Sequence, residues 1–212
     1  MERFLSRIGG LIISPKETMT IIAHERRGLA EPFILIIIFS AFYWSSLTLS
    51  INHLINYFTI WTEILKFIYA FIIPWTSIII GLGIAADIIL WLLFSFGVYL
   101  MAKLVNGAGN FEDTLSIIGY SIVSRIFMII PLIFSPIAPV TSIVTSLILS
   151  IASIIWTIYL SSLGISEIHG LTFEKALILV ILIPLIIIGV LIIIPMLLSI
   201  YGFIFHFWRW IG

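Results

Sequence analysis

The sequence predicts an all-α integral membrane protein: a bundle of about five membrane-spanning helices preceded by an amphipathic N-terminal helix. Hydrophobic residues make up 62% of the 212 residues and charged residues only 9%, whereas soluble domains carry about 25% charged residues. The apolar runs are long and unbroken, and the run 32–49 approaches the roughly 20 residues that a helix needs to cross a bilayer. A transmembrane barrel would need short alternating segments instead. We therefore expect one helical membrane domain.

The membrane domain is predicted to cover residues 29–212, behind a leader at 1–28. The expected spans are 31–50, 67–104, 111–134, 140–163 and 173–207. The second is longer than one perpendicular crossing needs, and Pro74 lies inside it, so we expect a long tilted or kinked helix. The third and fifth spans begin with capping residues, Asn110 and Thr172. The polar segment 164–172 is expected to connect the last two spans.

The leader has the pattern of an amphipathic helix that lies on a membrane surface. Its apolar residues recur at helical spacing, and basic residues such as Arg3 and Arg7 lie between them. The apolar residues are Phe4, Leu5, Ile8, Leu11 and Ile12. The pattern predicts an interfacial helix, with a simple solvated leader as the alternative.

Basic residues near the ends of the spans predict the orientation in the membrane. Five of the ten Lys and Arg residues precede the first span, and Lys103 and Lys175 fall on the same side of the predicted topology. Lys66 and Arg209 fall on the other. Since cytoplasmic segments carry the excess of Lys and Arg, we expect a multi-pass protein with its N-terminus in the cytoplasm and its C-terminus outside, in the cell membrane if the source is prokaryotic.

Asp87 and Arg125 are the two charged residues deep within predicted spans. A charge at the bilayer centre costs at least about 2.5–3.5 kcal/mol, so each should face the bundle and seek a partner. Spans two and three are antiparallel neighbours, and an Arg side chain is long enough to cover the difference in depth between these positions. The two residues either form an ion pair that fixes packing, which we favour, or line a polar site for protons, ions, lipid or solute.

Other chemistry-bearing residues predict no catalytic site. Glu167 and His169 fall in the last connection, where a solvated loop is favoured over a metal site. The chain has no Cys, and it lacks the Gly-x-Ser-x-Gly, His-Glu-x-x-His and phosphate-loop motifs. We therefore expect no enzyme activity, no metal, no cofactor and no nucleic-acid partner.

Several segments resemble the Yip1 domain as it occurs in archaeal and bacterial proteins. They are the leader 14–18, the start of the first span at 29–32, the stretch 110–120 and the stretch 156–177. The family-motif positions in these segments are Glu31, Pro32, Gly119, Tyr120, His169 and Gly170. The resemblance implies five spans and a cytoplasmic N-terminus. Eukaryotic members carry Asp-Leu-Tyr-Gly-Pro ahead of the first span, of which only Pro32 has a counterpart here, so their binding of prenylated Rab GTPases is not carried over.

The resemblance and the missing catalytic motifs favour a non-enzymatic membrane scaffold or adaptor. It would act through its leader and loops on the bilayer or on membrane and cytoplasmic proteins, in membrane organisation or a process like trafficking. The alternative is a small transporter, channel or lipid scramblase with Asp87, Arg125 and Tyr120 around a polar cavity between spans two and three. A third possibility is a subunit of a larger membrane complex. The sequence leaves the oligomeric state open, a homo-oligomer included.

Overall fold

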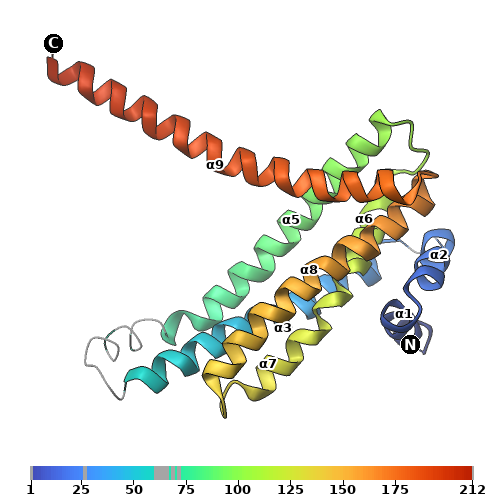
Figure 1. Ribbon diagram of the computed structural model, residues 1–212, viewed down its shortest axis with the longest axis horizontal. Coiled ribbons are helices and arrows are strands. Elements are labelled where there is room, and N and C mark those ends of the chain that lie inside the picture. Colours follow the sequence, from blue (N-terminus) through green and yellow to red (C-terminus); the bar gives the residue numbers. More distant parts are fainter. Residues whose placement is uncertain (1, 26–27, 60–66, 68–69, 71–72, 212) are drawn as a thin grey trace.

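The computed structural model describes residues 2–25, 28–59, 67, 70 and 73–211, and it confirms the predicted all-α membrane fold (Figure 1). No strand occurs within these ranges. The elements are α1 (Glu2–Ile13), α2 (Pro15–Glu25), α3 (Ala30–Thr59), the 3₁₀ helix η1 (Ile73–Trp75), α5 (Thr76–Leu104), α6 (Phe111–Ser121), the 3₁₀ helix η2 (Ile122–Met128), α7 (Ile129–Phe134), α8 (Pro139–His169) and α9 (Phe173–Ile211). Five segments are long and apolar enough to cross a membrane: α3, α5, α6 with η2 and α7, α8, and α9.

The leader forms two short helices that pack against the bundle. α1 and α2 meet at Ser14 and Pro15, and α2 lies against α8 and α6. Leu11 and Met19 are completely buried in these contacts. The predicted amphipathic helix is therefore present, but part of its apolar face covers protein, which leaves less of it for a membrane surface than the pattern suggested.

The second span differs from its predicted extent. Continuous α-helix begins at Thr76, directly after the 3₁₀ turn Ile73–Trp75, whereas we expected one tilted or kinked helix from residue 67; before the turn, Phe67 and Ala70 are helical. Pro74 explains the difference, because proline disfavours α geometry at the residue before it and cannot donate to the preceding turn. The start of this span as we predicted it, at 67–72, lies mostly outside the described residues.

The third span is a composite and not the single helix that we expected. Its middle, η2, is a seven-residue 3₁₀ helix, which is long for this tighter and less favourable geometry. Pro131 follows in α7 and cannot donate to the carbonyl of Phe127, which accepts another backbone N–H at the end of η2 instead. Because a 3₁₀ helix has fewer residues per turn than an α-helix, the Arg125 side chain points in a different direction around the helix axis than it would in a continuous α-helix.

The predicted connection between the last two spans is too long. α8 continues to His169, and Gly170 ends it in the left-handed conformation, at φ 63°, a glycine position typical of helix C-termini. Gly164 therefore lies inside α8. A Cβ added there would come within 2.9 Å of Ile117 Cδ1, so glycine is required for α8 to approach α6 this closely.

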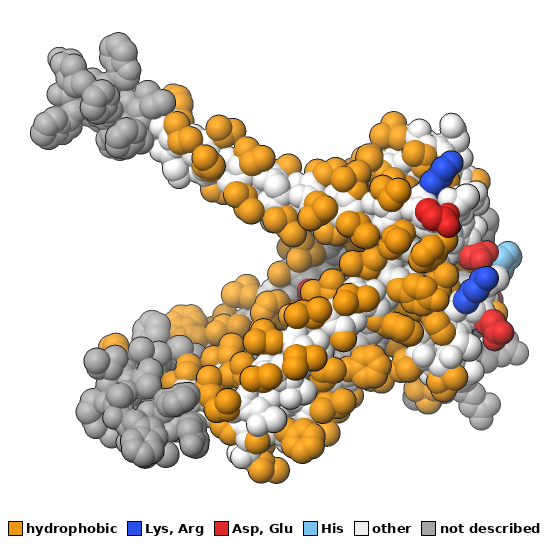
Figure 2. Space-filling view, in the orientation of Figure 1, with side chains coloured by type: hydrophobic (Ala, Val, Ile, Leu, Met, Phe, Trp, Pro, Cys, Tyr) orange, Lys and Arg blue, Asp and Glu red, His pale blue; other side chains and the backbone are white. Residues whose placement is uncertain are grey.

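The charged side chains gather at one end of the bundle (Figure 2). We call this the charged end: it comprises α1, α2 and the connections 105–110 and 170–172. Asn110 caps α6 there by accepting a 2.7 Å hydrogen bond from Asp113 N. From this end α9 runs across the bundle and then leaves it (Figure 1). Its early residues Ala176 and Val180 are buried, whereas Ile192 and Leu197 are exposed.

Candidate functional site

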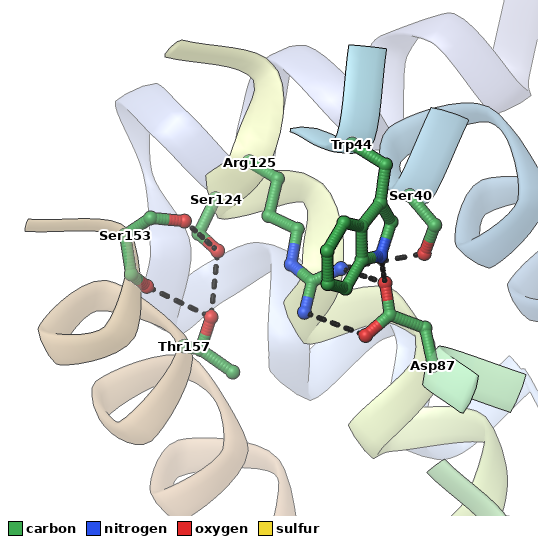
Figure 3. A network of polar contacts seen from close by, with 7 residues as sticks. All are labelled: Ser40, Trp44, Asp87, Ser124, Arg125, Ser153 and Thr157. Atoms are coloured by element: carbon green, nitrogen blue, oxygen red, sulfur yellow. Dashed lines mark hydrogen bonds and ion pairs between the residues drawn. The ribbon is translucent and has the colours of Figure 1, made fainter. Parts of the chain in front are cut away.

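An ion pair lies within the spans where α5 meets η2 (Figure 3). Arg125 Nη1 lies 2.5 Å from Asp87 Oδ2, and Nη2 lies 3.2 Å from Oδ1. Trp44 Nε1 of α3 donates a 3.0 Å hydrogen bond to the same Oδ2. The Asp87 side chain is 9% exposed and the Arg125 side chain 24% exposed. The structure thus brings together the two charged residues that the sequence singled out, and we call them the intramembrane pair.

The first span supplies the remaining contacts of Arg125. Ser40 Oγ accepts a 3.3 Å hydrogen bond from Nη1, and the guanidinium carbon lies 4.7 Å from the centroid of the Tyr43 ring. The sequence analysis missed Ser40, Tyr43 and Trp44. Their spacing of three and four residues places them on one face of α3, which was the available signal, but spacing alone does not say what that face contacts.

A hydroxyl cluster borders the other side of Arg125 (Figure 3). Ser124 Oγ lies 2.6 Å from Thr157 Oγ1 and 3.0 Å from Ser153 Oγ. Thr157 also donates to the backbone carbonyl of Ser153 at 2.8 Å. Arg125 therefore lies between its carboxylate partner and a neutral, hydrogen-bonding face of α8.

A second arginine joins the leader to the spans at the charged end. Arg7 of α1 is 7% exposed. Its Nη1 lies 2.6 Å from a Glu25 oxygen, and its Nη2 lies 2.8 and 2.7 Å from the two Glu31 oxygens. The Tyr120 hydroxyl of α6 also donates to Glu31. We call Arg7, Glu25, Glu31 and Tyr120 the leader clamp. The sequence analysis had placed Arg7 among residues facing a lipid surface.

Four of the family-motif positions meet at this clamp, and two of them, Glu31 and Tyr120, belong to it. Glu31 and Pro32 begin α3, and Gly119 and Tyr120 lie in α6. A Cβ added at Gly119 would lie 3.4 Å from Pro32 Cα and 3.3 Å from Trp91 Nε1. The two helices therefore approach closely where the motif residues face each other. Tyr120 contacts Glu31 and not the intramembrane pair, so the polar cavity proposed from the sequence has a different lining.

The other two motif positions, His169 and Gly170, lie at the α8–α9 connection. His169 is only 2% exposed, so the solvated loop predicted for it is wrong. Its Nε2 lies 2.9 Å from Thr114 Oγ1, and its ring fills the space over Gly107 and Gly109. The ring is buried because α8 extends to this residue and the connection 105–110 folds over it, with Ala108 N donating to the His169 carbonyl at 3.1 Å.

No metal site is apparent in the part of the chain that the structure describes: no three His, Cys, Asp or Glu side chains lie close enough together to hold an ion. Glu167, the other candidate ligand in this region, instead accepts a 3.3 Å hydrogen bond from the Thr20 hydroxyl of α2. Both candidate ligands therefore contribute to packing between helices.

Comparison with known proteins places this arrangement in a family. Neither the curated proteins nor the solved structures include a significant match to the sequence. The family model described as the Yip1 domain matches residues 9–194. The match includes all four segments that carry the resemblance and both members of the intramembrane pair. Because it covers nearly the whole chain, this multi-pass membrane protein belongs to the Yip1 domain family.

Proposed function

We propose that this protein is a non-enzymatic membrane scaffold or adaptor that presents its charged end to partner proteins in the cytoplasm. The observation that carries the proposal is the leader clamp. A free basic tail would have to be ordered whenever it bound a partner, at a cost in conformational entropy. Arg7 holds α1 and α2 against α3 and α6 beforehand, so a partner meets a preformed surface.

The composition of the charged end fits this role. Lys103, in the last turn of α5, bonds to the connection 105–110, and Lys175 lies in the first turn of α9. The excess of basic residues predicts that this end faces the cytoplasm. The docked leader still leaves Leu5, Ile13 and Ile21 exposed, Ile13 by 86%. Exposed apolar side chains beside basic ones suit the interfacial region of an anionic leaflet. We infer that the leader touches both lipid headgroups and partner.

The test is to extract the tagged protein from its native membrane into lipid nanodiscs and to quantify what co-purifies by mass spectrometry. Wild type should retain a stoichiometric protein partner that slows amide hydrogen exchange in α1 and α2. Arg7→Gln should lose most of the partner, while Lys16→Gln, an exposed position in the same leader, should retain it. Absence of any stoichiometric partner in wild type would contradict the adaptor function.

One observation favours a second function, that of a small carrier, channel or lipid scramblase. A cavity of about 390 Å³ borders Arg125 and lies between helices rather than at either end. This function requires flux of a solute or lipid in proteoliposomes, abolished in Asp87→Asn protein that still has its normal helix content and elution volume. If wild type shows no flux and retains a protein partner, the carrier function is contradicted and the adaptor function is supported.

A further inference from the structure

The cavity beside Arg125 is a groove along the facing sides of α8 and α9. Arg125 and Tyr43 form its inner end, and α8 supplies the remaining polar wall. The four hydroxyl residues of that wall are Ser150, Ser153, Thr157 and Ser161. Their spacing of three, four and four residues places them on one face of the helix, over about 16 Å at the helical rise. A polar strip of this length faces a hollow within the spans.

One hydroxyl of this strip is buried and lacks a partner. Ser161 is completely buried, and its Oγ makes no hydrogen bond to any residue that the structure describes. Serines in membrane helices usually donate back to the preceding turn or across to a neighbouring helix. Leaving the group unpaired in an apolar medium is unfavourable, because its hydrogen bond to water is lost and not replaced. An acceptor that enters the groove would remove this cost.

The opposite wall offers an acceptor. Pro184 and Val180 of α9 both line the groove. Proline has no N–H, so the carbonyl four residues earlier, that of Val180, is left without its helical donor. Val180 is buried, at 1% exposure, which withholds solvent from this carbonyl. The groove is therefore lined by an unpaired hydroxyl of α8 and by a residue of α9 whose carbonyl lacks its α-helical donor.

Arg125 adds a second donor without adding net charge. Both of its Nη atoms bind Asp87, and its Nε makes no hydrogen bond within the described ranges. Figure 3 shows the guanidinium with Asp87 on one side and the α8 hydroxyls on the other. Because Asp87 already neutralises the charge, an ionised headgroup would be buried here without a counter-ion, which is strongly unfavourable. A neutral ligand avoids that cost.

The groove lies beside exposed apolar faces of α8 and α9, which are the faces expected to contact lipid. Its rim consists of apolar side chains of α8 and α9, and Ile154 and Leu185 are each 60% exposed. Figure 2 shows the surface hollowed where α9 leaves the bundle. A water-soluble ligand would have to cross this rim, whereas an acyl chain can lie along it.

We propose that the α8–α9 groove binds a neutral bilayer lipid of the diacylglycerol class. Such a lipid has two ester carbonyls, which accept hydrogen bonds from Ser161 Oγ and Arg125 Nε. It also has one free hydroxyl, which donates to the Val180 carbonyl, and its acyl chains extend over the apolar rim. This proposal is independent of the adaptor function, since a bound lipid and a docked partner occupy different parts of the molecule.

The test uses the full-length protein in phosphatidylcholine nanodiscs and a diacylglycerol with a photoreactive diazirine in one acyl chain. Labelled peptides are identified by mass spectrometry. Labelling should concentrate on residues 150–161 and 180–185, and unlabelled dioleoylglycerol should compete it away. Ser161→Ala, which removes one hydrogen bond, should weaken competition about fivefold. Ser150→Phe, which fills the groove, should abolish the labelling.

The control is Thr141→Phe, at an exposed position of the same helix outside the groove, which should label like wild type. Unchanged labelling of both groove variants would overturn the proposal, as would labelling spread evenly along the exposed residues of α9. Dioleoylphosphatidic acid competing as well as dioleoylglycerol would overturn the preference for a neutral headgroup. If Ser150→Phe fails to fold, Ser161→Ala alone decides the outcome.

Discussion

The leader clamp and the intramembrane pair use the same kinds of side chain in different surroundings. In each, an arginine donates two hydrogen bonds to a carboxylate: Arg7 Nη2 to both oxygens of Glu31, and the two Nη atoms of Arg125 to Asp87. An aromatic side chain also donates to each carboxylate, Tyr120 to Glu31 and Trp44 to Asp87. The exposed fractions are similar, with the partners reversed: Arg7 is 8% and Glu31 27% exposed, whereas Arg125 is 24% and Asp87 9% exposed. The location differs, because the clamp joins the leader to the start of α3 and the intramembrane pair lies within the apolar spans. The clamp also holds a second acid, Glu25.

The difference in surroundings determines what each arrangement contributes. A desolvated ion pair adds little net stability, but breaking it leaves one charge buried without a partner. At the leader clamp the two carboxylates, Glu25 and Glu31, are partly exposed at 32% and 27%, so water can replace a lost arginine there at smaller cost. The intramembrane pair should therefore determine whether the spans pack at all, and the leader clamp should determine whether α1 and α2 are docked.

Asp87→Asn should have the largest effect on stability. It leaves the Arg125 charge within the spans without its carboxylate, which should lower the free energy of unfolding by about 3–5 kcal/mol. Thermal or denaturant unfolding in detergent or nanodiscs measures the loss. The double variant Asp87→Asn with Arg125→Gln should partly recover stability, since no charge remains. Equal and additive losses would show that the two side chains are not energetically coupled.

Arg7→Gln should have a smaller and more local effect. It removes the charge that holds Glu25 and Glu31 together, and we expect it to weaken docking of the leader by about 1–3 kcal/mol. Amide hydrogen exchange should rise in α1 and α2 and stay unchanged in α5. Raising the salt concentration should increase leader exchange in wild type as well, because salt screens partly exposed pairs most.

Lys16→Gln is the matched control for this variant, because it removes the same charge from an exposed position in the same leader. It should leave exchange in α1 and α2 as in wild type. If it raises exchange as much as Arg7→Gln does, general electrostatic attraction holds the leader in place and the specific contacts of Arg7 do not.

Sequence reasoning succeeded where composition and local chemistry decide the structure. Apolar runs predicted the five spans and the all-α fold, because a backbone in hydrocarbon has to satisfy its hydrogen bonds within the helix. The cap at Asn110 followed from local pattern in the same way. The charges of Asp87 and Arg125 stood out because they interrupt apolar runs. Their pairing was one of two hypotheses, the other being a polar site for protons, ions, lipid or solute.

Sequence reasoning failed where contacts between residues distant in the sequence determine the structure. Spacing in the sequence does not assign an indole N–H to a distant carboxylate, so Trp44 was missed as a partner of Asp87. Arg7 was read as a lipid-facing residue because its two partners lie 18 and 24 residues away. His169 was read as solvated because the length of α8 depends on the close approach at Gly164, which no local pattern reveals. The 3₁₀ geometry of η2 was likewise not visible in its sequence.

Tyr120→Phe should have the smallest effect and tests whether the two aromatic donors are alike. It removes only the hydroxyl that donates to Glu31, while Arg7 still binds that carboxylate, so we expect a loss of about 1 kcal/mol. The loss should appear as faster exchange in the leader, with unfolding of the spans unchanged. Tyr99→Phe is the control, because the Tyr99 ring packs on Phe111 and its hydroxyl has no partner among the described residues. A loss at Tyr120 as large as that of Asp87→Asn would mean that the clamp is as fully desolvated as the intramembrane pair, and the distinction between the two would fail.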